Sequence, residues 1–545
     1  MEYAILGIFS AAFIFLFAGN ILQNEINHPY PFGYFASDAF QNYGIAKGLQ
    51  DSGSYKYQPF SVAGGFSDVV GTHYPILYHI VVLVSNATGL QIYDSLVLTM
   101  ILFLLVTCLS AYAIIRKYNS KIAIISLPFM LILAQPKFMN AILFGQHGLI
   151  TGSMFLVGFA LALIYFELDI GMIIVFFSAT LLGHGGEFVY AGILFVIYLA
   201  IRFFRKEFKF SDAAKVVLIG IGTFIVIIYY FVIAQYTWGR GGYGNFEIIS
   251  VEKFAQSNSF PAILFNVEFN IMMFALIIIG VIIAILGLLK KLDIPIITSL
   301  FLLLLGFSNY FGFGYRAFQQ RFSWPVYISI FAAIAIYFAV KLILKNVSII
   351  YAGIIFLILS GIFVSAYNQQ IVSGLMDPYH WDSFLWIQKN VEKDKPVYFF
   401  YQSMITQRSI YYASTQRKTY VIDISKFVEK IQQRKLSRYI HMDISAEGGT
   451  GLPYRKSFFK FGYHMEDPET ASKLSGDFDL CNMDYLVFDK IANGNAKPLA
   501  DYNLLIINEL KKNPWIVEVY PNNPVVSILK NTKPGEKCID EQQLN

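Results

Sequence analysis

The chain has 545 residues, of which 56% are hydrophobic, 17% aromatic and only 14% charged. Its mean hydropathy is +0.54, and a soluble domain carries roughly twice its charged fraction, so an ordinary soluble protein is excluded. The net charge of +5 is mild and has no long basic run, so no nucleic-acid partner is expected. Three cysteines exclude a disulfide-rich scaffold.

Apolar stretches long enough to cross a membrane recur through the first two thirds of the chain. About 20 apolar residues cover the ~30 Å hydrocarbon core. The first stretch is predicted to be retained and to direct insertion, since no cleavage pattern follows it. The apolar segment 74–90 is shorter and is predicted to be an interfacial or re-entrant helix. The predicted spans lie near residues 3–22, 92–115, 121–140, 147–167, 170–186, 187–204, 214–236, 271–289, 293–311, 322–341 and 347–367.

Lysine and arginine in the short loops predict the orientation of these spans. If eleven spans alternate, four basic groups fall on the same side, and the positive-inside rule makes that side cytoplasmic. The N-terminus is then cytoplasmic and residues 368–545 are extracytoplasmic, in the multi-pass cell membrane of a prokaryote, archaeal or bacterial. The four groups are Arg116, Lys117 and Lys121; Arg202, Arg205, Lys206 and Lys209; Lys290 and Lys291; and Lys341 and Lys345.

Acidic residues divide the chain into two domains. Residues 1–367 hold 15 of the 36 Asp and Glu, and residues 368–545 hold the other 21. We therefore expect a polytopic α-helical membrane domain over 1–367, with a first outer loop at 23–91, and an extracytoplasmic α/β domain over 368–545.

Local patterns predict the elements of the second domain. "HWDSFLWIQKNV" has helical spacing, "KPVYFFY" and "DYLVFDK" are typical of strands, and "WIVEVYPNNPVVSILKN" is typical of a hairpin. Cys481 and Cys538 fall here, and the sequence leaves open whether they pair or remain two thiols.

The stretch "SDAFQNYGIAKGLQDSGSY" in the first outer loop predicts a short helix with Asp38 in its first turn. Ala39, Tyr43, Ala46 and Leu49 share one face, and Gly53 is suited to end the helix. An acid at this position favours the helix dipole by ~0.3–1 kcal/mol, which is a purely structural explanation of Asp38.

Other ionisable and polar residues fall in the same outer loops. Ionisable groups at the membrane edge are costly and usually mark a functional site, so a converging site is predicted. Besides Asp38 the residues are Asp51, Asp68 and His73; Gln146 and His147; His184 and Glu187; Arg240, Glu247 and Glu252; and Arg316 and Arg321.

Each group also has a structural explanation. His147 lies between glycines and fits a polar turn. His184 and Glu187 are three residues apart, so they share a helix face and can pair with each other. Arg316 and Arg321 fit either snorkelling anchors or a bound phosphate; because they lie on the outer side, against the inside-positive trend, phosphate binding is favoured.

Four features in order resemble the GT-C glycosyltransferases, and most closely the branch that contains the catalytic subunit of oligosaccharyltransferase. They are the first span followed by the Asp-led helix, the segment "THYPILYHIVVLVSNATGL", Arg321 in "QQRFSWPVY", and the domain that begins "WDSFLWIQKNVEKDKPVYFF". The resemblance covers nearly the whole chain.

The resemblance implies transfer of a sugar from a polyprenyl-phosphate-linked donor to a glycan, glycolipid or protein acceptor at the outer face of the membrane. Asp38 matches the first-loop acid that acts as base or metal ligand, and Glu252 is the nearest match to a glutamate that engages the acceptor. Arg321, with Arg316 as second candidate, matches the residue that holds the carrier phosphate.

A divalent metal, Mn²⁺ or Mg²⁺, is implied by the same resemblance. The second outer loop has "GQH" in place of an acidic pair, so either His147 substitutes as a ligand or the metal is absent. His73, His184 and Glu187 are further candidates for binding a metal or the acceptor.

The chain departs from that branch in the C-terminal domain. The Trp-Trp-Asp-Tyr-Gly motif that reads the acceptor sequon is replaced by "YFFYQSMITQRSIYYA", which has no Asp. An oligosaccharyltransferase is therefore not expected. A transporter or flippase of lipid-linked sugars and a non-catalytic subunit of a surface-glycan assembly remain alternative functions.

Overall fold

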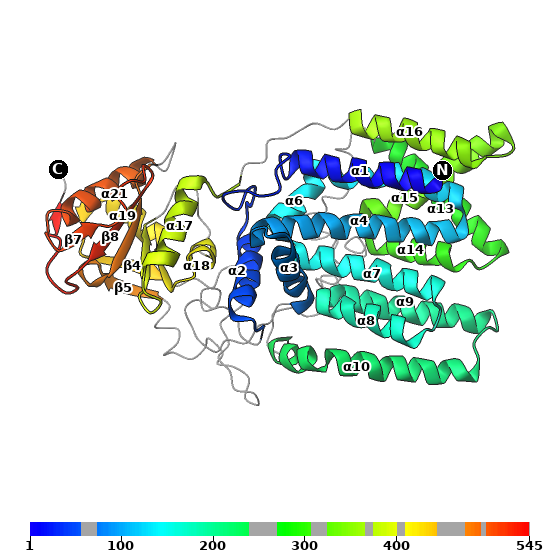
Figure 1. Ribbon diagram of the computed structural model, residues 1–545, viewed down its shortest axis with the longest axis horizontal. Coiled ribbons are helices and arrows are strands. Elements are labelled where there is room, and N and C mark those ends of the chain that lie inside the picture. The colour runs from blue at the N-terminus through cyan, green and yellow to red at the C-terminus, as the bar shows by residue number, and fades with distance from the viewer. Residues whose placement is uncertain are drawn as a thin grey trace.

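The structure is a computed structural model that describes residues 1–55, 74–238, 270–306, 324–365, 374–400, 409–443, 475–491 and 497–543. It has a bundle of long apolar helices and, beside one end of the bundle, a C-terminal unit built on a β-sheet (Figure 1). The fold therefore separates a membrane-like part from a part of soluble character, as the division of acidic residues predicts.

The bundle helices match the predicted spans in position. Among the described residues, seven are long and apolar enough to cross a membrane, and a bent pair makes an eighth if it counts as one span. Three others, α8, α14 and α16, are apolar but shorter. The helices are α1 (Glu2–Asn20), α4 (Ile92–Tyr118), α5 (Ser120–Met130), α7 (His147–Tyr165), α8 (Ile170–Gly183), α9 (Gly185–Phe204), α10 (Phe210–Trp238), α13 (Asn270–Lys290), α14 (Ile294–Gly306), α15 (Trp324–Leu344) and α16 (Ile349–Ser365).

The span predicted near 121–140 is bent. Helix α5 runs into a 3-10 turn, Leu131–Ala134, and the chain bends by 50° into α6 (Pro136–Phe144). Gln135 is extended immediately before the proline, because a residue that precedes proline disfavours the helical conformation. The bend directs α6 toward the end of the bundle that faces the C-terminal unit.

Two short helices lie across that end of the bundle: α2 (Ser37–Ser52) and α3 (Pro75–Thr88) (Figure 1). Helix α2 packs against α3, α4 and α6 on one side and against the C-terminal helix α18 (Ser409–Thr415) on the other. Segment 74–90 is therefore a short helix, as predicted, and its depth in a membrane remains a prediction.

The turns that carry the four basic groups lie at the opposite end of the bundle, far from the C-terminal unit (Figure 1). The N-terminus lies there as well, where Glu2 forms an ion pair with Arg116 at 2.5 Å. This common location is what the positive-inside argument requires, and the cytoplasmic assignment itself remains a prediction.

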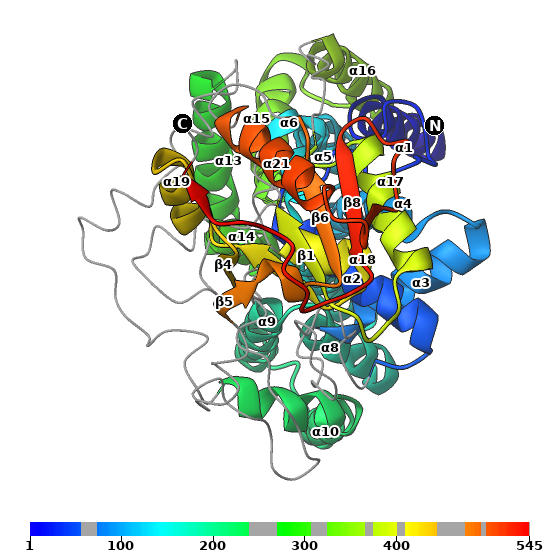
Figure 2. The same cartoon turned by 90° about the vertical axis from the view of Figure 1, so that its left-hand side faces the viewer.

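The C-terminal unit is a mixed sheet with helices on both faces (Figure 2). In the described residues seven strands follow the order β5-β4-β2-β1-β6-β8-β7, with β1 parallel to β2 and β6. The strands are β1 (Val397–Phe400), β2 (Thr419–Ile422), β4 (Tyr439–Asp443), β5 (Ser475–Asp479), β6 (Tyr485–Asp489), β7 (Ile516–Glu518) and β8 (Val526–Asn531), and β3 (Lys435–Leu436) pairs separately with β9 (Gln542–Gln543). The predicted strands and closing hairpin are confirmed.

Alternating side chains give the sheet two apolar faces. Val397 and Phe399 join a core that includes α17 (Pro378–Asn390) and is continuous with the bundle. Tyr398 and Phe400 join a separate core with α19 (Ile424–Gln432) and α21 (Lys497–Leu510). Helices α17 and α18 therefore lie between the sheet and the bundle.

Cys481 and Cys538 form a disulfide with a Cα–Cα distance of 5.3 Å, which answers the question that the sequence left open. The bond links the 3-10 turn Leu480–Asn482, after β5, to the C-terminal tail. It closes a loop of 57 residues of sequence separation, and so restricts the unfolded chain.

A buried histidine fastens helix α17 to the sheet. The ring of His380 bonds through Nδ1 to Asp377 and through Nε2 to Asp489 at 2.6 Å. Both partners are carboxylates, so both ring nitrogens act as donors and the imidazole is protonated. Burial lowers the pKa of His380, but the bonds to Asp377 and Asp489 outweigh it and raise this pKa to about 9.

We predict that His380→Gln makes the protein less stable at neutral pH. Because the folded-state pKa of His380 lies above its unfolded value, its stabilisation is fully present below pH ~6.5 and is lost as pH rises through about 9. The difference in unfolding free energy should be on the order of 2–3 kcal/mol near pH 6. Thermal unfolding of purified full-length protein from pH 6 to 10 measures it.

The matched control is His441→Gln, because His441 pairs with the largely exposed Asp477. It should change the unfolding temperature little at any pH. An equal loss in both variants, or a His380→Gln loss that stays constant to pH 10, would show that the buried pair does not carry the effect.

Candidate functional site

Asp38 lies in the first turn of α2, as predicted, and its side chain is partly exposed. The helix has the expected buried face, with Ala39 and Ala46 fully buried. It ends at Gly53, which has a left-handed φ of 67°. A partly exposed carboxylate at a helix start is available to a substrate, and it also suits the helix dipole, so both explanations of Asp38 stand at this level.

A buried hydrogen-bond network fixes the loop that leads into α2. The backbone N–H of His28 donates to Asp94 at 2.8 Å, and the His28 ring bonds to the same carboxylate at 2.7 Å. Tyr93 donates its hydroxyl to the His28 carbonyl, and Tyr34 donates to the Tyr93 carbonyl. The first outer loop is therefore attached to the start of α4 before it presents Asp38.

Gly145, which ends α6, makes the closest contact with the start of α2. A Cβ placed on Gly145 would lie 2.3 Å from the Ala39 backbone nitrogen and 2.5 Å from the Asp38 carbonyl carbon. Gly145 also has a φ of 95°, which disfavours any side chain. The glycine of "GQH" thus lets the α6–α7 turn touch the backbone that carries Asp38.

Asn42 joins three elements one helical turn after Asp38. Its amide donates to the Gly145 carbonyl at 2.9 Å, and its oxygen accepts from the Tyr78 hydroxyl of α3 at 2.7 Å. Burial and then the charge of Asp38 raise the pKa of Tyr78. Helices α2 and α3 and the α6–α7 turn therefore form one polar cluster, which we call the Asp38 cluster (Asp38, Asn42, Tyr78, Gly145).

His147 follows this cluster as the first residue of α7 and is fully buried. Its Nε2 bonds to the Ile142 carbonyl at 2.8 Å, so Nε2 carries the hydrogen. In a neutral ring Nδ1 then offers a lone pair, and this buried atom has no hydrogen-bond partner in the described part of the chain. A histidine that donates one N–H to a backbone carbonyl and offers its other nitrogen has the arrangement of a metal ligand.

His184 and Glu187 pair with each other, as their spacing predicts. Nδ1 of His184 lies 2.6 Å from a carboxylate oxygen of the fully buried Glu187. Gly152 of α7 packs against both side chains. The His184 ring also contacts Tyr74, directly before α3, with ring centroids 5.5 Å apart.

The loop that leads into α2, the α6–α7 turn and the α8–α9 turn therefore meet at one end of the bundle. Gly148, one residue after His147, is close enough to His184 that a Cβ there would lie 3.8 Å from the ring. Predicted residues that lie outside the described part of the chain are Asp68, His73, Arg240, Glu247, Glu252, Arg316 and Arg321. Their approach to Asp38 remains a prediction.

Sequence reasoning missed Asn42, Tyr78 and the contact role of Gly145. Asn42 is four residues after Asp38 and so on the same side of the helix, which was an available signal. Tyr78 lies in the "YPILYH" segment, which predicted an apolar helix and contributed to the family resemblance but gave Tyr78 no role.

A cluster of three or more His, Cys, Asp or Glu side chains is not assembled within the described residues. Mg²⁺ and Mn²⁺ are commonly held by one or two protein side chains together with substrate phosphates. Asp38 and His147 come from segments in contact and supply a carboxylate and an imidazole lone pair, so they fit such a partial site.

The C-terminal unit packs against the side of α2 that faces away from the bundle. Trp381 of α17, which is 2% exposed, packs against Tyr43 of α2 and Tyr93 of α4, with ring centroids 5.7 Å apart in each case. The backbone N–H of Leu375 donates to the Tyr34 carbonyl at 2.7 Å. The helix that carries Asp38 is therefore held between the bundle and the C-terminal unit.

We predict that Gly145→Ala destabilises the protein more than Gly89→Ala. Both glycines have positive φ, and Gly89 has no atom within 4 Å of an added Cβ. The backbone strain of about 1–2 kcal/mol is common to both variants, so the difference reports the contact with α2. Thermal unfolding of the two full-length variants measures it, and equal losses would contradict a tight contact between Gly145 and α2.

Solved structures with a similar fold were found, although no family model and no curated sequence matches the chain. The archaeal oligosaccharyltransferase AglB from Archaeoglobus fulgidus, in complex with an inhibitory peptide and a dolichol-phosphate, aligns with a TM-score of 0.52 at 12% identity. That alignment covers 90% of this chain and 69% of AglB. The same enzyme tethered to an acceptor peptide containing the NVT sequon aligns with a TM-score of 0.51 at 11% identity, over 98% and 74% of the two chains.

ArnT from Cupriavidus metallidurans bound to undecaprenyl phosphate aligns over 98% of this chain and 99% of its own, with a TM-score of 0.51 at 11% identity. Identities this low show the fold alone. These neighbours are GT-C membrane glycosyltransferases, and the resemblance drawn from the sequence is confirmed at that level. The chain is a polytopic α-helical membrane protein with a C-terminal α/β domain, and it has the fold of the GT-C membrane glycosyltransferases.

Proposed function

We propose that this protein is a glycosyltransferase that takes a sugar from a polyprenyl-phosphate-linked donor at the outer face of the membrane. The observation that carries the proposal is the position of Asp38, a partly exposed carboxylate on a helix whose backbone contacts Gly145 and whose Asn42 bonds to Gly145 and Tyr78. A rigidly supported acid at the edge of an apolar bundle suits a reaction on a lipid-borne substrate.

In the proposed reaction an acceptor hydroxyl oxygen bonds to the anomeric carbon of the donor sugar. The bond between that carbon and the phosphate oxygen breaks, and polyprenyl phosphate leaves with the electron pair. As a general base, the Asp38 carboxylate accepts the proton of the acceptor hydroxyl, which requires an approach of about 3 Å. The low dielectric of the bundle end strengthens the charges and keeps water from the donor.

The alternative role of Asp38 is to hold a divalent cation together with His147. A bound Mn²⁺ or Mg²⁺ would supply positive charge to the departing phosphate. Buried His147 is suited to this role because its Nε2–H is already donated to Ile142, which fixes the ring orientation.

The remaining assignments rest on the sequence and its resemblance to the GT-C enzymes. Arg321, with Arg316 as second candidate, would neutralise the phosphate that departs, and Glu252 would engage the acceptor. His73, His184 and Glu187 are secondary candidates for binding the acceptor. The pairing of His184 with Glu187 favours a supporting role for that pair.

The share of each neighbour's length that this chain covers favours a small domain on the acceptor side. The chain covers 99% of ArnT but 69–74% of the AglB structures with a TM-score above 0.5. Together with the missing sequon motif, this supports a transferase of one or a few sugars to a glycan, glycolipid or surface protein. The N-terminus would be cytoplasmic and the C-terminal domain extracytoplasmic, in a prokaryotic cell membrane.

We predict that Asp38→Asn lowers the rate at which polyprenyl phosphate is released from lipid-linked sugar donors by at least about 100-fold. This is the usual contribution of a positioned base to the rate. The change is nearly isosteric, so it removes charge and leaves the packing of α2 intact. The assay compares purified wild-type and variant protein in the same detergent with a panel of donors.

Asp51→Asn is the matched control, because Asp51 is exposed, lies on the same helix and pairs with the half-buried Lys47 at 2.7 Å. It should retain wild-type turnover. Equal turnover in the Asp38 variant would remove Asp38 from the mechanism, and transbilayer movement of the donor without turnover would favour the flippase.

We predict that His147→Gln raises the Mn²⁺ concentration needed for half-maximal turnover by about 10-fold or more, if His147 is a ligand. Chelator should abolish wild-type turnover, and added Mn²⁺ should restore it. Turnover that resists chelation, or an unchanged Mn²⁺ response in the variant, would leave Asp38 as a base that works without a metal.

A further inference from the structure

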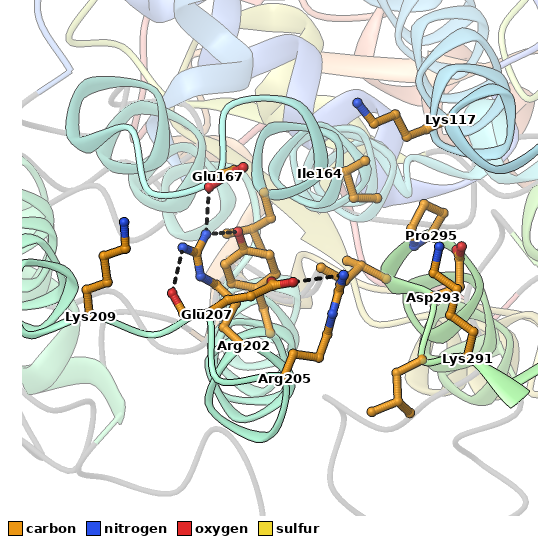
Figure 3. A pocket seen from close by; sticks show the side chains of 14 residues that line it. Lys117, Ile164, Glu167, Arg202, Arg205, Glu207, Lys209, Lys291, Asp293 and Pro295 are labelled. Atoms are coloured by element: carbon orange, nitrogen blue, oxygen red, sulfur yellow. Dashed lines mark hydrogen bonds and ion pairs between the residues drawn. The ribbon is translucent and has the colours of Figure 1, made fainter. Parts of the chain in front are cut away.

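A cavity of about 510 Å³ opens at the end of the bundle opposite to Asp38. It lies between the ends of α4, α7 and α9 and the α13–α14 turn, so segments far apart in the sequence form its walls (Figure 3). None of its lining residues belongs to the Asp38 cluster. It is therefore a separate site, for which the proposed transfer reaction has no use.

The cavity is lined by five cationic and three acidic side chains, a net charge of +2. Two of the acids are used internally: Glu167 pairs with Arg202 at 2.7 Å, and Glu207 pairs with Arg205 at 2.8 Å. The third, Asp293, accepts the Ile296 N–H at its helix start at 3.4 Å.

Three lysines, Lys117, Lys209 and Lys291, line the same cavity and form no ion pair with any described residue. The ammonium of Lys117 lies over the Tyr165 ring, 5.2 Å from its centroid. Figure 3 shows these lysines arriving from separate sides of the cavity. Uncompensated cations around a hollow favour an anion with several acceptor oxygens.

Arg202 is a fixed part of the cavity wall. Its side chain is 11% exposed, and its two terminal nitrogens bond to Glu167, Tyr198, Asp212 and the Glu207 carbonyl. Its Nε is buried and has no hydrogen-bond partner within the described ranges. The bonds of the terminal nitrogens fix the guanidinium in the cavity wall, where its positive charge adds to that of the three lysines.

Large exposed apolar residues alternate with these cations. Phe203 and Phe204, between Arg202 and Arg205, are 68% and 75% exposed, and Phe210, beside Lys209, is 94% exposed. The positive-inside rule explains basic residues at this end, but it does not require a cavity between them. The three phenylalanines do not line the cavity, but they lie next to its cations in the sequence and are exposed, so they offer apolar surface to the chains of a ligand whose charged head enters the cavity.

We infer that this basic cavity binds the phosphate of an anionic phospholipid head group. Lysine and arginine supply charge-assisted hydrogen bonds to the phosphate oxygens, and Phe203, Phe204 and Phe210 contact the acyl region. In the proposed topology the site lies in the inner leaflet, opposite to the transfer reaction. The inference depends on the membrane-embedded bundle and is independent of the proposed activity.

The test is lipid retention by native mass spectrometry of the purified full-length protein, titrated with phosphatidylglycerol or with phosphatidylcholine. Wild type should retain phosphatidylglycerol preferentially. The double variant Lys209→Ala/Lys291→Ala should bind it about 10-fold more weakly, because each lysine near a lipid phosphate contributes severalfold to affinity. Lys290→Ala is the matched control, since Lys290 is exposed and adjacent but does not line the cavity.

Thermal unfolding with added inorganic phosphate distinguishes a lipid from a soluble ligand. Phosphatidylglycerol should raise the unfolding temperature of wild type and of Lys290→Ala, whereas inorganic phosphate at equal concentration should not. Equal lipid retention in the double variant and in Lys290→Ala would overturn the inference. Stabilisation by inorganic phosphate as large as that by lipid would overturn the lipid assignment.

Discussion

The packing of Trp381 against Tyr43 and Tyr93 is the contact on which the arrangement of the molecule depends. This one side chain of the C-terminal domain joins the helix that carries Asp38 to the first long helix after the outer loop. Buried aromatic rings of this size contribute strongly to stability and have a preferred geometry, so they fix position as well as proximity. The C-terminal domain therefore acts as a structural support of the candidate site.

The Asp38 cluster shows how a membrane bundle can hold a polar site at its edge. Charged groups are expensive in hydrocarbon, and here they are gathered at helix ends, where unpaired backbone groups already require polar partners. Gly145 permits backbone contact, and Asn42 joins its carbonyl to the hydroxyl of Tyr78. Mutual support among three elements reduces the freedom of each, which is what precise placement of a reacting group requires.

Sequence reasoning succeeded where the signal is local. The helix of Asp38 follows from its apolar spacing and from Gly53, and the pairing of His184 with Glu187 follows from a separation of three residues. It did not predict the bend inside an apolar window: hydropathy over 121–140 is continuous, but α5 ends at Met130, a 3-10 turn follows, and a new helix begins at Pro136. The contact of Gly145 with α2 joins residues about a hundred positions apart, which no local pattern contains.

The disulfide of the C-terminal domain has a consequence for biogenesis. Such bonds form and persist in oxidising compartments, whereas a reducing cytoplasm keeps thiols free. Cys538 follows all the described spans in the sequence, so the bond with Cys481 closes only after those spans have been synthesised. In the proposed topology, oxidation of this pair therefore shows that the C-terminal domain has crossed the membrane and folded there. By then the helix that carries Asp38 has already been synthesised and placed.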